Sequence, residues 1–337
     1  MRTSDFSRYI LGICATAAML AGCGGSQPPI GAPSAMSQSH AIATHDRGGS
    51  WMLPEAKAGD LLYVSNNALG TVNAYTYPEG HLVGSLTGFI TPFGECTDAA
   101  GDVFIVAYSD SSKKASTIYE YAHGGTAPIA TLSDPTVAFG CAIDPATGNL
   151  AASGGGVAIF THATGTPMMY YSSQFTFFYC GYDNRGNLYL SAWNDQQENQ
   201  ALLVRLATAS HSFEQITLDA TLYMDVGFEF WPSVQWDGKH MAVSSGPERR
   251  PASIYRLRIS GSTATVAGTT NLSTQKDVYT GQFVLQGRTV VGLGNYKRGA
   301  TVFLWRYPRG GSPYRKASKA GHRYELRGAA ISVASSR

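Results

Sequence analysis

The sequence predicts an all-β fold, a six-bladed β-propeller in which about six four-stranded sheets form a ring. The composition supports this class, because 44% hydrophobic residues, only 14% charged residues and 38 glycines are typical of a turn-rich β protein and exclude coiled coils and most helical bundles. A short motif also recurs along the chain, at intervals near the period of about 40 to 50 residues that is typical of propeller blades.

The recurring motif is a small residue, an aspartate, a glycine turn and an apolar strand. It is clearest in GECTDAAGDVFIV from Gly94, GCAIDPATGNLAAS from Gly140 and YCGYDNRGNLYLSA from Tyr179, and a weaker copy, PSVQWDGKHMAVSS, starts at Pro232. Its aspartates are Asp98, Asp144, Asp183 and Asp237, at intervals of 46, 39 and 54 residues. We interpret them as turn residues whose carboxylates accept backbone N–H groups.

Hairpin patterns such as TIYEYAHGGTAPIATL lie between these motifs, so each repeat supplies about four strands. The first repeat, from Leu61, lacks the strand that precedes the aspartate elsewhere. The segment ELRGAAISVA from Glu325 has the character of that strand and no hairpin after it. We expect this C-terminal strand to complete the first blade and close the ring, which removes an exposed sheet edge. A longer repeat around Thr221 makes the count six blades, plus or minus one.

The N-terminal residues 1–22 have the shape of a secretory signal peptide, in which two arginines precede a short apolar stretch. The stretch ends in the letters LAGC, which resemble the lipobox of bacterial lipoproteins. This resemblance implies cleavage before Cys23 and lipidation of its thiol, and Gly24 beside it favours the outer membrane. We therefore expect export across the inner membrane and lipid anchoring in the cell envelope, where two or more acyl chains hold a protein durably.

Residues 23–58 are rich in Gly, Ser and Pro without apolar periodicity, so we predict a flexible tether there and a propeller domain over residues 59–337. Within that domain the run LLYVSNNALGTVNAYTYPEG is similar to YVTN-type repeats, and the later Asp-Gly units resemble NHL-type repeats. The resemblance covers roughly residues 61–334. It implies a propeller fold without implying an activity, because propellers host lactonases, lyases, scaffolds and ligand binders.

Three of the five cysteines remain in the propeller domain, namely Cys96, Cys141 and Cys180. The last two stand three residues before an aspartate, whereas Cys96 stands two before and should face the opposite way in its strand. An oxidising envelope permits a disulfide between Cys141 and Cys180, but equivalent points on adjacent blades are often too far apart for one. We favour buried free thiols, and no CxxC or Cys/His pairing supports a metal site.

The net charge is +2, but residues 288–337 hold eleven Lys or Arg and one acid. This basic sector, with Arg309, Arg315, Lys316 and Lys319, is a candidate contact for an anionic surface or an acidic glycan, while a solvated rim is the simpler interpretation. Expected partners are therefore the membrane, through lipidated Cys23, and an envelope protein, glycan or anionic surface. Nucleic acid is not expected after export.

The expected function is a binding or scaffold module of unknown ligand that needs no cofactor. The alternative is a metal-dependent hydrolase similar to gluconolactonase-type propellers, with a divalent metal such as calcium at the channel mouth. Its candidate acids are Glu95, Asp225 and Glu229, whose spacing matches no catalytic motif. A second candidate ligand face consists of Tyr170, Tyr171, Phe175, Phe177, Phe178 and Tyr179, which sheet packing explains more simply.

Overall fold

The computed structural model describes residues 49–194, 196, 200–224, 231–246, 252–273, 279–296, 299–320 and 326–334. The chain divides into two units, residues 1–45 and 46–337, and all the described residues belong to the second. The predicted signal peptide, Cys23 and residues 23–48 of the predicted tether lie outside the described residues. Within the described residues, no helix is long and apolar enough to cross a membrane.

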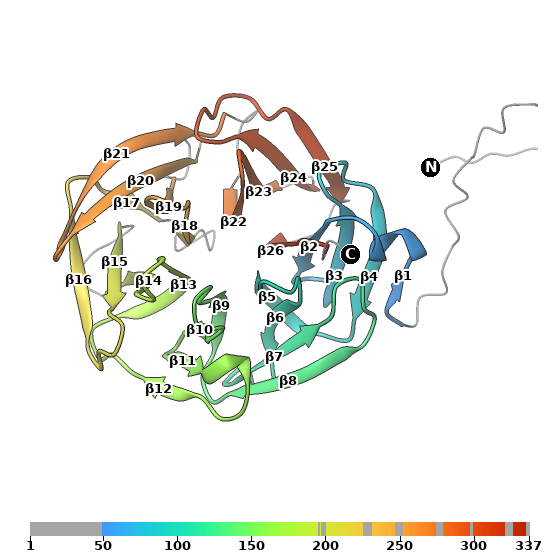
Figure 1. The fold of residues 1–337 in the computed structure, drawn as a ribbon, viewed down its shortest axis with the longest axis horizontal. Coiled ribbons are helices and arrows are strands. Elements are labelled where there is room, and N and C mark those ends of the chain that lie inside the picture. The colour runs from blue at the N-terminus through green and yellow to red at the C-terminus, as the bar shows by residue number, and fades with distance from the viewer. Residues whose placement is uncertain are drawn as a thin grey trace, which may run out of the picture. The chain divides into compact units, whose positions relative to one another are not determined.

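The described part is almost entirely β-structure, arranged as sheets around a common centre in a propeller-like ring (Figure 1). The first sheet runs outward from β26 (Leu326–Ser332) through β2 (Leu61–Asn66), β3 (Thr71–Thr76) and β4 (Leu82–Thr87) to β1 (Trp51–Met52). The second contains β5 (Ile90–Thr97), β6 (Val103–Tyr108), β7 (Ser116–Tyr121) and β8 (Pro128–Asp134). The third contains β9 (Ala138–Ile143), β10 (Leu150–Gly154), β11 (Val157–Phe160) and β12 (Met168–Tyr170).

The fourth sheet is larger than the others. It begins with β13 (Thr176–Tyr182), β14 (Leu188–Trp193), β15 (Gln200–Leu206) and β16 (Phe213–Leu218), and continues with β21 (Thr263–Asn271), β20 (Ser253–Ser260), β19 (Met241–Ser245) and β18 (Val234–Trp236), while β17 (Leu222–Tyr223) pairs with β15. The fifth contains β22 (Tyr279–Gln286), β23 (Thr289–Tyr296), β24 (Gly299–Arg306) and β25 (Arg315–Ala320). Two short 3-10 helices, η1 (Pro54–Lys57) and η2 (Thr161–Ala163), complete the described elements.

The predicted all-β, propeller-like arrangement is confirmed, but the predicted count of six sheets is wrong, because hydrogen bonding divides the described strands into five sheets. Two antiparallel meanders, β13–β16 and β18–β21, share one sheet. Their outermost strands pair in parallel, with Thr217 opposite Thr263 and Leu218 opposite Ala264. This contact joins two predicted blades at the outer edge, which a pattern of strands and turns along the chain does not reveal.

The predicted ring closure is confirmed. Strand β26 pairs antiparallel with β2, with Leu62 opposite Ile331 and Tyr63 opposite Ala330, and so becomes the innermost strand of the first sheet. The predicted domain boundary at residue 59 is too late. Residues 51–57 of the predicted tether form β1, which pairs with β4, and η1, in which Ala56 is buried against the first sheet's core.

The repeated aspartates are turn residues, as predicted. The Asp183 carboxylate accepts the backbone N–H groups of Arg185 at 2.8 Å and Asn187 at 2.9 Å. Asp98, Asp144 and Asp237 accept backbone N–H groups of their own turns in the same way. The carboxylates therefore stabilise the connection between the two innermost strands.

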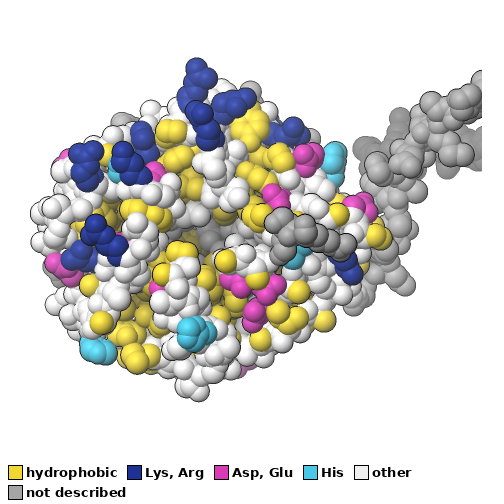
Figure 2. Space-filling model, viewed as in Figure 1, with side chains coloured by type: hydrophobic (Ala, Val, Ile, Leu, Met, Phe, Trp, Pro, Cys, Tyr) yellow, Lys and Arg dark blue, Asp and Glu magenta, His cyan; other side chains and the backbone are white. Residues whose placement is uncertain are grey.

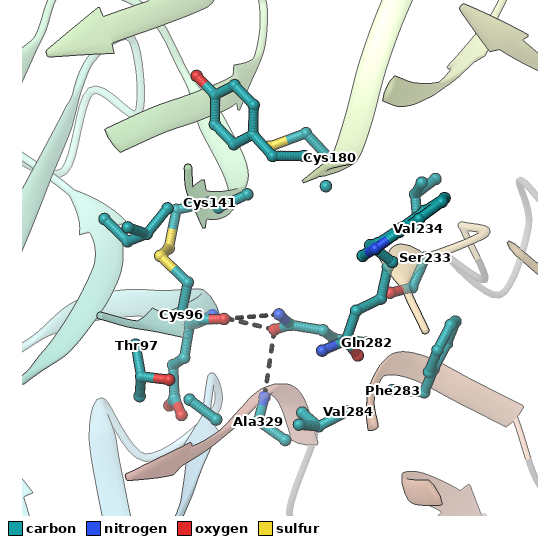
Figure 3. A pocket seen from close by; sticks show the side chains of 18 of the residues that line it. Cys96, Thr97, Cys141, Cys180, Ser233, Val234, Gln282, Phe283, Val284 and Ala329 are labelled. Carbon is teal, nitrogen blue, oxygen red and sulfur yellow. Dashed lines mark hydrogen bonds between the residues drawn. A yellow bond between two sulfur atoms is a disulfide. The ribbon is translucent and has the colours of Figure 1, made fainter. Parts of the chain in front are cut away.

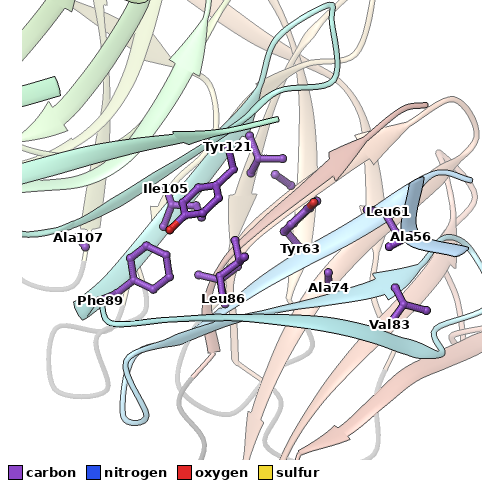
Figure 4. Close-up of a cluster of buried hydrophobic side chains, with 13 residues drawn as sticks. Ala56, Leu61, Tyr63, Ala74, Val83, Leu86, Phe89, Ile105, Ala107 and Tyr121 are labelled. Atoms are coloured by element: carbon purple, nitrogen blue, oxygen red, sulfur yellow. The ribbon is translucent and has the colours of Figure 1, made fainter. Parts of the chain in front are cut away.

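The hydrophobic core lies between neighbouring sheets. Figure 4 shows the cluster between the first two sheets, where Leu61, Tyr63 and Leu86 meet Ile105 and Tyr121. The same type of packing accounts for part of the aromatic segment that the sequence offered as a second ligand face. Phe177, Phe178 and Tyr179 are buried, and the Phe178 ring stacks on Trp231 with ring centroids 4.8 Å apart. Such face-to-face sheet packing uses large side chains.

Candidate functional site

A cavity of about 250 Å³ lies at the centre of the ring. Its lining comes from the innermost strands β5, β9, β13, β18, β22 and β26, so every meander contributes to it. Figure 3 shows the cavity from close by. Side chains on the innermost strands meet here because the strands converge towards the ring centre, although they are far apart in the sequence.

The Gln282 side chain links three of these strands. Its Oε1 accepts the backbone N–H groups of Glu95 at 2.9 Å and Ala329 at 3.2 Å, and its Nε2 donates to the backbone oxygen of Glu95 at 2.6 Å. These bonds are drawn as dashed lines in Figure 3. The ladder between β22 and β23 shifts its register between Thr280 and Phe283, which is where Gln282 lies. Gln282 therefore fixes β5 against the fifth and first sheets.

Glycine at position 94 leaves room for this link. A Cβ on Gly94 would lie 2.6 Å from the backbone oxygen of Phe139 and 3.3 Å from Oε1 of Gln282. Both separations are tighter than ordinary van der Waals contact. The glycine that opens the repeat motif therefore allows the close approach of β5 to β9 that forms this side of the cavity.

Glu95, one of the lining residues, has an unusual buried carboxyl group. Glu95 is 1% exposed, and neither of its carboxyl oxygens has a hydrogen-bond partner among the described residues. Burial raises its pKa well above the ordinary value of a glutamate, because a buried carboxylate loses its hydration. Burial also raises the pKa of nearby Tyr63 to about 12, with a smaller contribution from the charge of Glu95. A buried polar group without a partner is costly, so it points to a functional role.

The cysteines differ from the prediction. Cys96 and Cys141 form a disulfide with their Cα atoms 5.7 Å apart, and Cys180 is a buried free thiol. The expected orientation of Cys96 explains the pairing, since Cys96 faces the next sheet while Cys141 faces the preceding one. The innermost strands converge at the centre, so two such residues reach disulfide distance. All three cysteines line the cavity, and burial raises the pKa of Cys180 to about 12.

The other candidate acids, Asp225 and Glu229, lie outside the described residues. Of the three candidates, the structure therefore places only Glu95, which is a lining residue of the cavity but whose two carboxyl oxygens are buried. Among the described residues, no group of three or more His, Cys, Asp or Glu side chains is placed to hold a metal ion. Sequence reasoning missed Gln282, although an amide directly before the apolar run FVL is a signal that could have identified it.

The basic candidates lie away from the cavity, on the fifth sheet and the turn before β25. Arg309, Arg315 and Lys316 are exposed, whereas only the backbone of Lys319 is described, within β25. The ammonium group of Lys316 lies 5.7 Å from the centroid of the Phe303 ring, and the guanidinium of neighbouring Arg306 lies 5.2 Å from that of Tyr314. Figure 2 shows Lys and Arg side chains gathered along the upper edge of this face.

Comparison with known proteins supports the fold. No protein-family model and no curated protein matches the chain. A Bacteroides caccae protein of unknown function has a similar structure, with a TM-score of 0.58 at 11% identity over 81% of this chain and 99% of that one. A chain of a nidogen/laminin complex gives 0.56 at 12% identity over 82% and 100%, and Kuenenia stuttgartiensis hydrazine synthase gives 0.51 at 12% identity over 79% of each chain. At these identities the likeness shows a β-propeller fold and nothing about activity.

Proposed function

We propose that this chain is a binding module of the cell envelope, and that it binds a small ligand in the central cavity. The observation that supports the proposal most is the cavity itself, which has a volume of about 250 Å³ and receives lining residues from the innermost strands of all five sheets. Ligand pockets typically combine an apolar lining with a few polar groups that orient the ligand. The lining residues have this composition, with Thr97 and Gln235 among apolar residues such as Val284 and Ile331.

Binding fits the site better than metal-dependent hydrolysis does. Among the described cavity-lining residues Glu95 is the only acidic side chain, whereas a calcium site takes six to eight oxygen ligands, often several of them carboxylate. The Oε1 atom of Gln282 already accepts two backbone N–H groups. Hydrolysis of a lactone that depends on added calcium would instead support the hydrolase alternative.

The cavity proposal is tested by narrowing the cavity. Ile143 is a half-buried lining residue on β9, so Ile143→Trp is expected to weaken binding of small probes such as 2-phenylethanol and 2-phenylethylamine at least about tenfold, because the larger ring occupies ligand space. Ile159→Trp is the matched control, since Ile159 is also half-buried but does not line the cavity. Isothermal titration calorimetry measures both. Equal binding by the two variants, or none by the unchanged protein, would contradict the proposal.

We also propose that the chain is a lipoprotein with YVTN- and NHL-type repeats, anchored through lipidated Cys23 in the outer membrane. The basic sector, including Arg309, Arg315 and Lys316, would then contact anionic head groups or glycans near that membrane. The support is the LAGC segment, for the anchor, and the exposure of these three basic side chains, for the contact. Exposed cationic side chains attract an anionic surface within about one Debye length.

One set of variants tests the lipid anchor and the basic contact separately. Cys23→Ser is expected to move the protein from the membrane fraction to the soluble fraction. In that background, charge reversal of Arg309, Arg315 and Lys316 to Glu is expected to remove binding to vesicles that contain anionic lipid, with about 1 kcal/mol lost per reversed side chain at low salt. Sedimentation with vesicles measures this, and neutral vesicles are the control. Membrane association that survives Cys23→Ser, or vesicle binding that survives the reversals, would refute the corresponding contact.

A further inference from the structure

We propose that Asp134 makes the connection between the second and third sheets pH-sensitive, so that the connection is closed when this carboxyl group is neutral and opens when it is ionised. The inference goes beyond ligand binding and does not depend on it. It follows from the position of Asp134, from the hydrogen bonds of the connecting segment, residues 134–138, and from the charges around the carboxyl group.

Asp134 faces the third sheet. It is the last residue of β8, at the outer edge of the second sheet, and the chain passes from there to β9, the innermost strand of the third sheet (Figure 1). Leu132 and its partner Ile118 on β7 belong to the core cluster that also contains Ala138 and Cys141 of β9. Because side chains two positions apart lie on the same face of a strand, Asp134 faces the same interface as Leu132.

Hydrogen bonds hold the connecting segment in place. Oδ1 of Asp134 accepts the backbone N–H group of Thr136 at 2.8 Å and its hydroxyl at 2.9 Å. The hydroxyl oxygen of Ser116, the residue opposite Asp134, accepts the N–H group of Ala138 at 2.8 Å. The backbone oxygen of Val137 accepts an N–H group from the turn after β10 at 2.7 Å. These bonds join the second and third sheets at the connecting segment.

The other carboxyl oxygen makes the segment sensitive to charge. Asp134 is 1% exposed, and its Oδ2 is buried without a hydrogen-bond partner among the described residues. Burial of an ionised carboxylate costs far more hydration energy than burial of a neutral carboxylic acid. Burial accordingly raises the pKa of Asp134 to about 6, although the two hydrogen bonds from Thr136 act in the opposite direction. The buried group therefore changes charge near pH 6.

The surrounding charges do not offset the cost of ionisation. The titratable side chains of the neighbouring strands are Tyr108 of β6, Tyr119, Glu120 and Tyr121 of β7, and Cys141 of β9. Tyr119 and Tyr121 pack on the opposite face of the sheet, Glu120 lies at the opposite end of β7, and Cys141 is in the disulfide. The ring of Tyr108 packs edge-on against Phe93.

The turn before β7 carries three charged residues that are all exposed, namely Asp110, Lys113 and Lys114. Among the described residues, only burial and the bonds from Thr136 act on the pKa of Asp134. No cation therefore compensates the buried carboxylate within the part of the chain that the structure describes.

Opening of the connecting segment is expected to become more favourable as the pH rises. In the open segment Asp134 is hydrated and has its ordinary pKa of 3.8, whereas in the closed segment the pKa is about 6. The closed state is therefore fully favoured below pH 3.8 and loses this advantage as the pH rises through about 6. These two pKa values make the opening equilibrium constant about tenfold larger at pH 7 than at pH 5, with little further change above pH 7. The Cys96–Cys141 disulfide joins the same two sheets, so the opening stays local.

The test is hydrogen exchange of the full chain, followed by mass spectrometry at pH 5, 6, 7 and 8. Each rate is divided by that of an unfolded reference peptide at the same pH, because the exchange chemistry itself depends on pH. We expect the protection of a peptide that contains Thr136 and Ala138 to fall about tenfold between pH 5 and pH 7 and to level off above pH 7. Peptides of β23 report opening of the whole domain and should stay more protected at every pH.

Three variants locate the effect. Asp134→Asn keeps the shape and the Oδ1 acceptor but does not ionise, so the fall in protection is expected to disappear. Thr136→Val removes the hydroxyl that lowers the pKa of Asp134, so the fall is expected to move to higher pH. Glu120→Gln is the matched control, since Glu120 is a half-buried acid at the opposite end of β7 whose pKa burial also raises, and it should keep the fall. Thermal melts show which variants fold.

The outcomes decide the inference without reference to any ligand. It is wrong if the connecting segment is equally protected at pH 5 and pH 7, if Asp134→Asn keeps the fall, or if Glu120→Gln removes it. If Asp134→Asn does not fold, the Thr136→Val variant decides, and an unchanged midpoint overturns the inference. None of these results bears on binding in the central cavity, so the proposed function is tested separately.

Discussion

Deletion of residues 326–337 is expected to remove most of the stability of the folded domain, on the order of 5 to 10 kcal/mol, which is comparable with the whole stability of a typical protein. The deletion removes β26, the innermost strand of the first sheet. We expect the truncated chain to unfold at ambient temperature or to aggregate, because the inner edge of β2 is then an unpaired strand edge.

The size of the effect follows from the contacts of β26. The strand pairs with β2 along its length, and Leu326, Ala329, Ala330 and Ile331 are all buried. Neighbouring sheets also bond to it, since the hydroxyl of Thr97 donates to the backbone oxygen of Ile331 and Oε1 of Gln282 accepts the N–H group of Ala329. The deletion therefore loses a ladder, buried apolar side chains and links to both neighbouring sheets at once.

The matched control is deletion of residues 49–52, which removes β1 from the other edge of the same sheet. β1 pairs with β4 through only two residues, Trp51 and Met52, both half-buried, so the control is expected to cost a few kcal/mol at most. Chemical denaturation followed by circular dichroism compares the two. A truncation at β26 that unfolds at the same denaturant concentration as the control would show that the ring does not depend on its closure.

Removal of the Cys96–Cys141 disulfide is expected to have the second-largest effect. The bond closes a loop of 45 residues, and constraint of the unfolded chain by a loop of that length stabilises the folded state by about 4 kcal/mol. Cys96→Ala is therefore expected to lower the melting temperature by roughly 10 °C in a domain of this size. Reduction of the unchanged protein with dithiothreitol should give a shift of similar size.

The third and fourth sheets offer a place where a second disulfide could be introduced. Sγ of Cys141 lies 3.7 Å from the backbone oxygen of Phe104, the residue opposite Cys96. In the same way, Sγ of Cys180 lies 3.9 Å from the backbone oxygen of Ala151, the residue opposite Ala142. The position of Ala142 relative to Cys180 therefore corresponds to the position of Cys96 relative to Cys141.

Ala142→Cys is accordingly expected to form a second disulfide with Cys180 under oxidising conditions and to raise stability by about 4 kcal/mol before any strain is subtracted. Mass spectrometry of non-reduced peptides identifies the bond, and melts with and without dithiothreitol measure its effect. Cys180→Ala in the Ala142→Cys background is the control.

If Cys96→Ala melts at the same temperature as the unchanged protein, closure of the loop between Cys96 and Cys141 does not stabilise the fold, and the prediction for the native disulfide is wrong.

Local patterns in the sequence were sufficient for the repeated turns and for ring closure. The interval between aspartates, the glycine that follows each one and the missing strand of the first repeat depend on neighbouring residues or on simple strand counting. The structure confirms the Asp183 turn and the β26–β2 pairing for that reason. The sequence predicted the site only in part, since Glu95 was one of three candidate acids and nothing in its spacing distinguished it from the other two.

The sequence by itself therefore determined that the chain forms short strands and Asp-Gly turns, and that its last strand returns to its first sheet. Only the tertiary structure decided that Cys96 pairs with Cys141, that β16 joins β21, and that Glu95 meets Gln282 at the central cavity. The physical reason is how far apart along the chain the interacting residues lie. Turns and strands depend on residues a few positions apart, whereas these contacts depend on how closely whole sheets converge at the centre or approach at the outer edge.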